Sequence, residues 1–280
     1  MTSPTAERVG VSPAELKRAW RAVQSGAFTD ENVNDSGVLP RRAPAGPLWR
    51  PVATERVVPV IGCSPGCGST TTGLALATAA ADRVRLIECG PAATSGLVAA
   101  STAELGRHLS GWLQGTRDQV LLERISDPTI HWADQLPIPS TPTRAIDLTV
   151  LDVSWPIGQV LSGACWLPGQ IRAAQIVVLV TAATIPGLRH LETTLAQLRS
   201  VPAVTAVVGP PRKRWPKPLW RTAGPRTQAL DNDGRLVVIP KDRQLAITGV
   251  DASRLPPALV DAGRRLFEIV TDRRVKGDRP

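Results

Sequence analysis

The sequence lacks an apolar run long enough to cross a membrane, which takes about 20 residues. Its first ten residues, MTSPTAERVG, also lack the apolar core of a signal peptide. These two absences argue against a membrane-spanning or secreted protein. We therefore expect a chain with no transmembrane segment, located in the cytoplasm of a bacterium.

Cysteine is scarce, with four residues at positions 63, 67, 89 and 165. Cys63 and Cys67 are four positions apart, and no histidine or second cysteine pair follows at the spacing of zinc ligands. A cluster of three thiols that includes Cys89 is one interpretation. Reduced thiols that act as small apolar side chains are the other, and we favour it because so loose a spacing is a weak metal signal.

The length and charge of the chain leave several classes open. A chain of 280 residues with 42% hydrophobic residues can form one α/β domain with appendages, or two small domains. Its net charge of +9 raises the expectation of a polyanionic partner, either nucleic acid or an anionic membrane.

The segment Val57–Gly73, VVPVIGCSPGCGSTTTG, has the layout of a phosphate-binding loop without its lysine. The apolar run Val57–Ile61 predicts a buried strand, and a glycine-rich turn leads into a helix that Ser69 opens. Such a corner gathers backbone N–H groups and the positive end of a helix dipole around one concavity, where a phosphate fits. Ser69 stands where the usual lysine would contact the β- and γ-phosphates.

Apolar, β-branched runs predict strands that are buried on both faces of a sheet. These runs are Val57–Ile61, Val84–Ile87, Leu148–Leu151, Ile176–Val180, Val204–Val208 and Leu236–Ile239. Helical patterns lie between them, over Thr70–Ala81, Pro186–Ser200 and Pro256–Thr271. This alternation predicts an α/β fold with a predominantly parallel sheet and helices on both faces. The segment Ser101–Arg144 is irregular and receives no assignment.

Composition divides the chain into four parts. Residues 1–28 predict an N-terminal helix, because Ser12, Pro13 and Glu15 form a start signal before an apolar face. Residues 29–55 read as a flexible linker, residues 56–272 as the α/β domain, and residues 273–280 as a disordered basic tail. The N-terminal helix packs either on its own domain or on a protein partner, and both interpretations stay open.

From Arg56 to Val270 the order of these motifs resembles the ParA/MinD family of P-loop ATPases. The family's loop reads Lys-Gly-Gly-x-Gly-Lys-Thr-Thr, and the matching stretch is Ser64-Pro65-Gly66-Cys67-Gly68-Ser69-Thr70-Thr71. Two glycines and both threonines match, whereas both lysines are serines. In the family, the first lysine reaches across a dimer to the partner's nucleotide and the second contacts the phosphates.

The resemblance extends to the acidic elements of the family. Glu88 stands at the first acid of the family's Asp-x-Asp-Pro element, and Gly90 stands at the second, which helps to orient the attacking water. The strand that ends in Asp152 matches the family's third element. The resemblance implies that Thr70 binds Mg²⁺ directly and that Asp152 holds it through water. A strand-end residue that caps the next turn is the alternative for Asp152.

The resemblance implies that ATP or ADP binds with Mg²⁺ and that two copies of the chain associate as a dimer. The implied nucleotide-binding residues are Gly66, Cys67, Gly68, Ser69, Thr70, Thr71 and Pro240. Because three catalytic groups of the family are missing, we expect a pseudo-ATPase and assign no catalytic residue. One alternative is an active ATPase whose missing cation comes from Arg83, Arg85 or a partner chain. Another is a DNA-binding or protein adaptor without nucleotide.

The segment Gly209–Arg226 carries six basic residues and no acidic one. Arg212, Lys213, Arg214, Lys217 and Arg221 are the candidate polyanion-binding residues. Trp215 and Trp220 lie among them and either stack on bases or pack against the edge of the sheet. We prefer DNA to membrane as the polyanion. By resemblance alone, the expected role is in partitioning, maintenance or transfer of plasmid or chromosomal DNA.

Overall fold

The computed structural model describes residues 17, 48–80 and 83–272. The chain divides into two units, residues 1–41 and residues 42–280. In the first unit the structure describes a single residue, Lys17, which is helical. The predictions for the rest of the N-terminal helix, for most of the linker and for the basic tail therefore fall outside the described residues.

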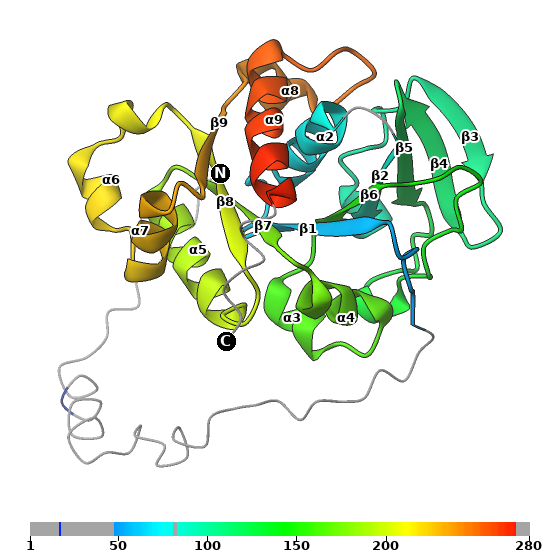
Figure 1. The fold of residues 1–280 in the computed structure, drawn as a ribbon, viewed down its shortest axis with the longest axis horizontal. Helices are drawn as coiled ribbons and strands as arrows, with labels where there is room; N and C mark the ends of the chain where they lie inside the picture. The colour runs from blue at the N-terminus through cyan, green and yellow to red at the C-terminus, as the bar shows by residue number, and fades with distance from the viewer. Residues whose placement is uncertain (1–16, 18–47, 81–82, 273–280) are drawn as a thin grey trace, which may run out of the picture. The chain divides into compact units, whose positions relative to one another are not determined.

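The described part of the second unit is built on a nine-stranded sheet in the order β3-β4-β5-β2-β6-β1-β7-β8-β9 (Figure 1). The strands are β1 (Arg56–Gly62), β2 (Val84–Cys89), β3 (Ala103–Arg107), β4 (Trp112–Arg117), β5 (Val120–Ile125), β6 (Leu148–Val153), β7 (Val177–Ala182), β8 (Ala203–Gly209) and β9 (Leu236–Pro240). Neighbouring strands run parallel, except that β4 is antiparallel to both β3 and β5. The predicted mostly parallel α/β sheet is thus confirmed.

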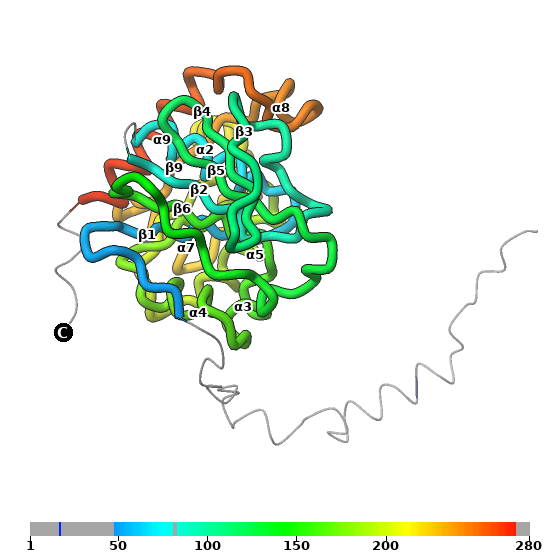
Figure 2. Tube along the Cα trace, turned by 90° about the vertical axis from the view of Figure 1, so that its right-hand side faces the viewer, coloured from blue at the N-terminus to red at the C-terminus, as the bar shows by residue number. Residues whose placement is uncertain are grey.

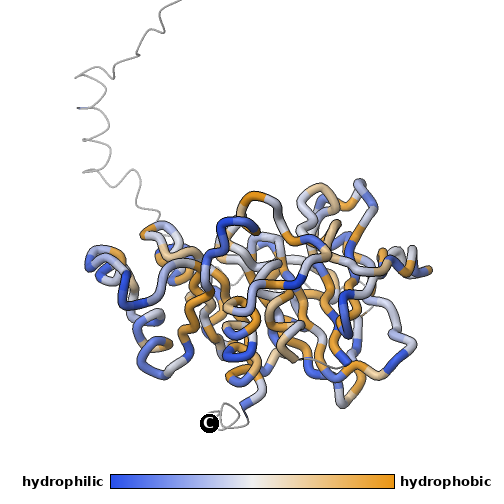
Figure 3. The backbone as a smooth tube through the Cα atoms, turned by 90° about the horizontal axis from the view of Figure 1, so that it is seen from above, coloured by the Kyte–Doolittle hydropathy of each residue, from blue (hydrophilic) through white to orange (hydrophobic). Residues whose placement is uncertain are grey.

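Helices cover both faces of this sheet. The helices are α2 (Ser69–Ala79), α3 (Ile157–Ser162), α4 (Trp166–Ala173), α5 (Ile185–Gln197), α6 (Lys217–Arg221), α7 (Pro225–Asn232), α8 (Arg243–Thr248) and α9 (Pro257–Thr271). Helices α2 and α9 pack together over one face, and α3, α4 and α5 lie against the other (Figure 1). Hydrophobic segments run through the interior, and hydrophilic ones follow the exposed turns (Figure 3).

The central strands are mostly apolar because both of their faces are buried. All residues of β2 and β6 are buried, including the polar Arg85, Thr149 and Asp152. Each of the six predicted strands is present, and α2, α5 and α9 occupy the three predicted helical segments. Within residues 48–80 and 83–272, none of the helices combines the length and the apolarity that a bilayer crossing needs.

The unassigned segment Ser101–Arg144 contains the three strands β3, β4 and β5, which extend one edge of the sheet (Figures 1 and 2). Strands β4 and β5 form a hairpin whose turn includes Asp118 at a φ of 50°. Strand β5 then pairs in parallel with β2. This meander widens the sheet on the side away from β9.

Residues 48–55, which the sequence assigns to the linker, contact the domain. Trp49 is buried, and its ring centroid lies 5.4 Å from that of Trp166 in α4. The backbone oxygen of Trp49 accepts a hydrogen bond from Gln170 over 2.8 Å. This end of the linker is therefore part of the packed domain.

Candidate functional site

The loop between β1 and α2 forms a tight corner at the carboxyl end of the parallel strands. Its start is fixed by the N–H of Cys63, which donates to the carbonyl of Val180 in β7 over 2.8 Å. Gly66 and Gly68 have φ angles of 69° and 94°, in the left-handed region that side chains disfavour. The two matching glycines of the loop are therefore required by its backbone. The predicted strand–turn–helix corner is present.

Helix α2 opens onto this corner with its N-terminal amides free of a side-chain cap. No acidic residue lies in its first turn, and Gly68 precedes it in the left-handed conformation. The carbonyl of Gly68 accepts the first helical bond, from Thr72 over 2.9 Å. The amides ahead of Thr72 and the positive end of the helix dipole therefore face the loop, where an anion binds favourably.

A pocket of about 1020 Å³ surrounds the loop. All the predicted nucleotide-binding residues line it, which brings together Gly66, Cys67, Gly68, Ser69, Thr70, Thr71 and Pro240. Its walls come from the ends of β6, β8 and β9 and from one side of α5. Its size is at the upper end of the range for small-molecule sites. The α5 wall, where His190, Thr193 and Gln197 line the pocket, is not among the sequence-based predictions.

Asp152 lies beneath this pocket at the end of β6 and bonds to the first turn of α2. The hydroxyl of Thr70 donates to Asp152 Oδ2 over 2.6 Å, whereas Oδ1 of the same buried carboxyl has no partner among the described residues. Burial raises the pKa of Asp152 to about 6, and hydrogen bonds from Thr70 and Ser69 oppose the rise. A buried oxygen without a partner beside a hydroxyl fits a divalent cation such as Mg²⁺.

Glu88 lies near the end of β2, directly beside Asp152, because the two residues are in register on neighbouring parallel strands. Its carboxylate accepts hydrogen bonds from the Ser95 hydroxyl and from the N–H of Gly96, the latter over 2.6 Å. Burial raises the pKa of Glu88 to about 7, and the charge of Asp152 adds to the rise. A Cβ on Gly96 would lie 2.9 Å from Thr70 Cγ2. Glu88 therefore holds the segment that closes over Thr70.

The pocket has few cations. Among its lining residues, all within the described chain, only Lys241 and His190 carry a basic group. Ser69 stands at the lysine position, and its Oγ would lie 3.4 Å from a Cβ on Gly62. This short side chain lies against the base of the loop. It leaves the phosphate cradle to backbone amides and hydroxyl groups.

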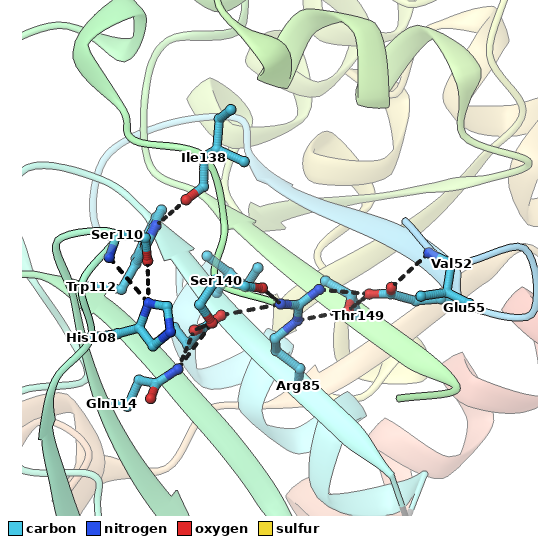
Figure 4. Close-up of polar contacts among 12 residues, drawn as sticks. Val52, Glu55, Arg85, His108, Ser110, Trp112, Gln114, Ile138, Ser140 and Thr149 are labelled. Carbon is cyan, nitrogen blue, oxygen red and sulfur yellow. Dashed lines mark hydrogen bonds and ion pairs between the residues drawn. The ribbon is translucent and has the colours of Figure 1, made fainter. Parts of the chain in front are cut away.

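Neither Arg83 nor Arg85 supplies the missing cation, so the suggestion that one of them does is wrong. The Arg85 side chain is completely buried and donates to Glu55 over 2.8 Å and to the Ser140 carbonyl over 2.8 Å (Figure 4). Arg83 forms an ion pair with Asp147. Both arginines are near the amino end of β2, and the loop lies at the carboxyl end of the parallel strands.

The basic segment folds back on itself through its aromatic residues. Trp215 is buried, and its Nε1 donates to the carbonyl of Pro210 over 2.8 Å. The Arg212 guanidinium lies 3.5 Å from the ring centroid of Trp220 and 3.6 Å from Asp231. The two tryptophans pack within the protein. The remaining candidate polyanion-binding side chains are exposed, namely Lys213, Arg214, Lys217 and Arg221.

The four cysteines carry free thiols. Burial raises the pKa of Cys63 to about 12 and also raises those of Cys67 and Cys89. Cys63 and Cys67 pack with opposite faces of the sheet. Among the described residues, no group of three metal-binding side chains occurs. These thiols therefore serve as neutral, small packing groups at neutral pH.

No family model matches the sequence, and no curated protein matches it either. Solved structures of similar fold include a plasmid partition protein from Borrelia burgdorferi, with 15% identity and a TM-score of 0.49. The alignment covers 77% of this chain and 97% of that chain. The septum site-determining protein MinD of Pyrococcus horikoshii, complexed with Mg-ADP, has 17% identity and a TM-score of 0.47. This second alignment covers 78% of this chain and 96% of the MinD chain.

Such identities and TM-scores describe a likeness of fold and leave activity, ligands and partners open. Both proteins are of the ParA/MinD type, the family whose motif order the sequence resembles. The described residues have the mostly parallel α/β sheet, with helices on both faces, that the sequence predicts.

Proposed function

We propose that this chain is a nucleotide-binding protein of ParA/MinD type that binds ATP or ADP with Mg²⁺ and is impaired in hydrolysis. The observation that carries the proposal is a glycine-built anion cradle that lines the pocket, bonded through Thr70 to a buried carboxylate, Asp152, directly beneath it. Backbone amides around Gly66 and Gly68 suit phosphate groups. Thr70 and Asp152 suit the metal ion that accompanies them.

Bound Mg²⁺ would neutralise part of the charge of the phosphates. The Thr70 hydroxyl and the partnerless Oδ1 of Asp152 are the groups that would hold it. The chain itself contributes orientation, because the hydrogen bond between Thr70 and Asp152 fixes the first turn of α2 against the end of β6. Hydrogen bonds from Ser95 and Gly96 to Glu88 hold segment 92–96 beside Thr70.

Impaired hydrolysis follows from the side chains that are present. Phosphoryl transfer is accelerated mainly by positive charge placed at the transferring group and by an oriented water. Ser64 and Ser69 provide no positive charge, and Gly90 provides no group that orients water. The carboxyl group of Glu88 accepts hydrogen bonds from Ser95 and Gly96. Binding is thus retained while the transition state loses its stabilising contacts.

Nucleotide titration by calorimetry tests the binding part of this proposal. Gly68→Ala places a Cβ at a φ of 94°, 3.4 Å from Val208 Cγ2, and should weaken binding about tenfold or more. Gly106→Ala is the matched control, because Gly106 has a φ of 91° in the exposed strand β3, outside the pocket. Equal effects of the two substitutions, or no binding to the unsubstituted chain, would contradict the proposal and favour an adaptor without nucleotide.

We further propose that the basic segment contacts DNA. Its support is the exposure of Lys213, Arg214, Lys217 and Arg221 in a stretch without acidic residues. Partitioning, maintenance or transfer of plasmid or chromosomal DNA would suit such a protein, on the strength of the motif resemblance. Dimer formation and a protein partner for the N-terminal helix stay predictions, as does a cytoplasmic location.

A further inference from the structure

The loop retains the contacts for the inner phosphates of a nucleotide and has lost the side chain for the outer one. In loops of this kind, backbone amides hold the α- and β-phosphates, and the lysine reaches the β- and γ-phosphates. Here Gly66 and Gly68 keep the left-handed turns that direct the amides inward. The residue at the lysine position is Ser69, whose side chain lies against Gly62. A third phosphate therefore gains little from this loop.

Two carboxyl groups close to the loop supply no positive charge for a further phosphate. Asp152 and Glu88 are the penultimate residues of neighbouring strands and are buried, and within the described residues neither forms an ion pair. Thr70 connects Asp152 to the first turn of α2. Each further phosphate brings negative charge toward these groups without a lysine to compensate it.

Lys241 brings the only ammonium group among the residues that line the pocket. It follows Pro240 at the end of β9 and is exposed, and it has no hydrogen bond or ion pair within the described residues. The next residue, Asp242, caps α8 by accepting from the N–H of Leu245 over 2.9 Å. This cap fixes the turn from which Lys241 extends.

The turn that carries Lys241 is connected to the loop through two strands. Val208 in β8 is in register with Ile239 in β9. A Cβ on Gly68 would lie 3.4 Å from Val208 Cγ2, so the end of β8 directly abuts the loop. Lys241 therefore follows the strand next to β8, which abuts the loop. It lies on the same wall of the pocket as Pro240, a predicted nucleotide-binding residue.

Resting on the proposed function, we propose that the pocket prefers a nucleoside diphosphate to a triphosphate and that Lys241 is the side-chain cation that helps to hold it. The pyrophosphate lies on the loop amides. The ammonium group of Lys241 offsets its charge from the β9 wall. A loop with a lysine at position 69 would favour the triphosphate, whereas this loop favours the diphosphate.

Calorimetric titration of the full chain with ADP and with ATP, both in excess Mg²⁺, tests the preference. ADP should bind more tightly than ATP. An affinity for ATP equal to or higher than that for ADP would overturn the inference and leave the proposed function intact. Failure of both nucleotides to bind would overturn the proposed function and this inference together.

Two substitutions test the residues, after circular dichroism has shown that each variant is folded. Lys241→Gln should weaken ADP binding by about threefold to tenfold. Arg243→Gln, which removes a neighbouring exposed cation that does not line the pocket, should leave the affinity unchanged. Equal affinities of the two variants would overturn the assignment of Lys241.

Ser69→Lys restores the missing lysine and tests the cause of the preference. It should shift the ratio of ATP affinity to ADP affinity by about tenfold in favour of ATP, because the charge-assisted contact to the outer phosphate is regained. An unchanged ratio would show that position 69 does not set the selectivity, and it would overturn the inference that the missing lysine causes the preference for a diphosphate.

Discussion

The hydroxyl of Thr70 donates a hydrogen bond to Asp152 Oδ2 over 2.6 Å and so connects the first turn of α2 to the end of β6. These residues are 82 positions apart in the sequence. The bond therefore joins two residues that the motif resemblance singles out. Thr70 matches a threonine of the family's loop, and Asp152 matches the acid of the family's third element. It also leaves the second carboxyl oxygen of Asp152 without a partner among the described residues.

Removal of the Thr70 hydroxyl should abolish the effect of magnesium on nucleotide binding. Thr70→Val keeps the shape of the side chain but leaves the buried carboxyl of Asp152 without its donor. We expect a loss of about 1–3 kcal/mol in the free energy of unfolding. Thr70→Ser retains the hydroxyl and should behave like the unsubstituted chain. Titration with nucleotide, with and without Mg²⁺, checks this, and an equal effect of magnesium in both variants would contradict it.

The stability of the protein should fall as the pH rises through the titration of Glu88. Burial raises the pKa of this carboxyl from 4.5 to about 7, so the folded state retains a proton that the unfolded chain releases within that window. Folding is therefore favoured below pH 4.5, and this contribution is lost as the pH approaches and passes 7.

Glu88→Gln should remove this pH dependence while keeping an acceptor for the N–H of Gly96. We expect the variant to be more stable than the unsubstituted chain by about 1–3 kcal/mol at about pH 8, with little difference near the ordinary pKa of the carboxyl. Urea unfolding at several pH values measures the effect. A variant that is destabilised equally at all pH values would show that the carboxyl is not protonated in the folded state.

The buried arginine of β2 should be important for folding, whereas its exposed neighbour should not. Arg85→Met leaves Glu55 and Glu123 buried without their cation and should cost about 3–5 kcal/mol of unfolding free energy. Arg83→Met removes an exposed ion pair with Asp147 and should cost about 1 kcal/mol or less. Thermal and urea unfolding compare the two variants, and similar losses would contradict the network shown in Figure 4.

Neutralisation of the exposed cations in the basic segment should weaken DNA binding. The variant carries glutamine at Lys213, Arg214, Lys217 and Arg221. An electrophoretic shift should fall steeply with salt in the unsubstituted chain and be lost in this variant. The control replaces four exposed arginines elsewhere, at Arg107, Arg189, Arg199 and Arg254. No shift at low salt, or an equal loss in the control, would exclude the segment as a specific contact.

Much of the central sheet and of the loop could be predicted because their signals are local. The run Val57–Ile61, the glycines at 66 and 68 and the threonines that follow are consecutive, and each reports on its own backbone. The acid at 152 comes near the end of a mostly apolar strand. Because parallel strands place their carboxyl ends at one edge of a sheet, these residues are predicted to meet.

The meander β3–β5 could not be predicted, because partners from distant segments compensate its buried charges. Glu123 in β5 is completely buried and accepts a hydrogen bond from Gln114 over 2.8 Å. Arg117 in β4 is also buried, and it donates to the carbonyl of Ala100 over 3.0 Å. Strand β3 is exposed throughout and shows no apolar alternation. The local sequence shows that charged residues are present. It does not show which distant residues bind them when they are buried.

The α5 wall of the pocket was missed for a related reason. Leu188, Leu191 and Leu195 give α5 an apolar stripe, and its other face reads as an ordinary solvated surface. In the structure, His190, Thr193 and Gln197 on α5 line the pocket. The burial of Trp215 depends in the same way on the carbonyl of Pro210 and on the fold of its own segment.

Release of phosphate from ATP by the purified full chain in Mg²⁺, measured beside Asp152→Ala, decides whether the protein turns ATP over. We predict that the unsubstituted chain releases phosphate no faster than the variant. Magnesium-dependent release that Asp152→Ala abolishes would show an active ATPase and contradict impaired hydrolysis.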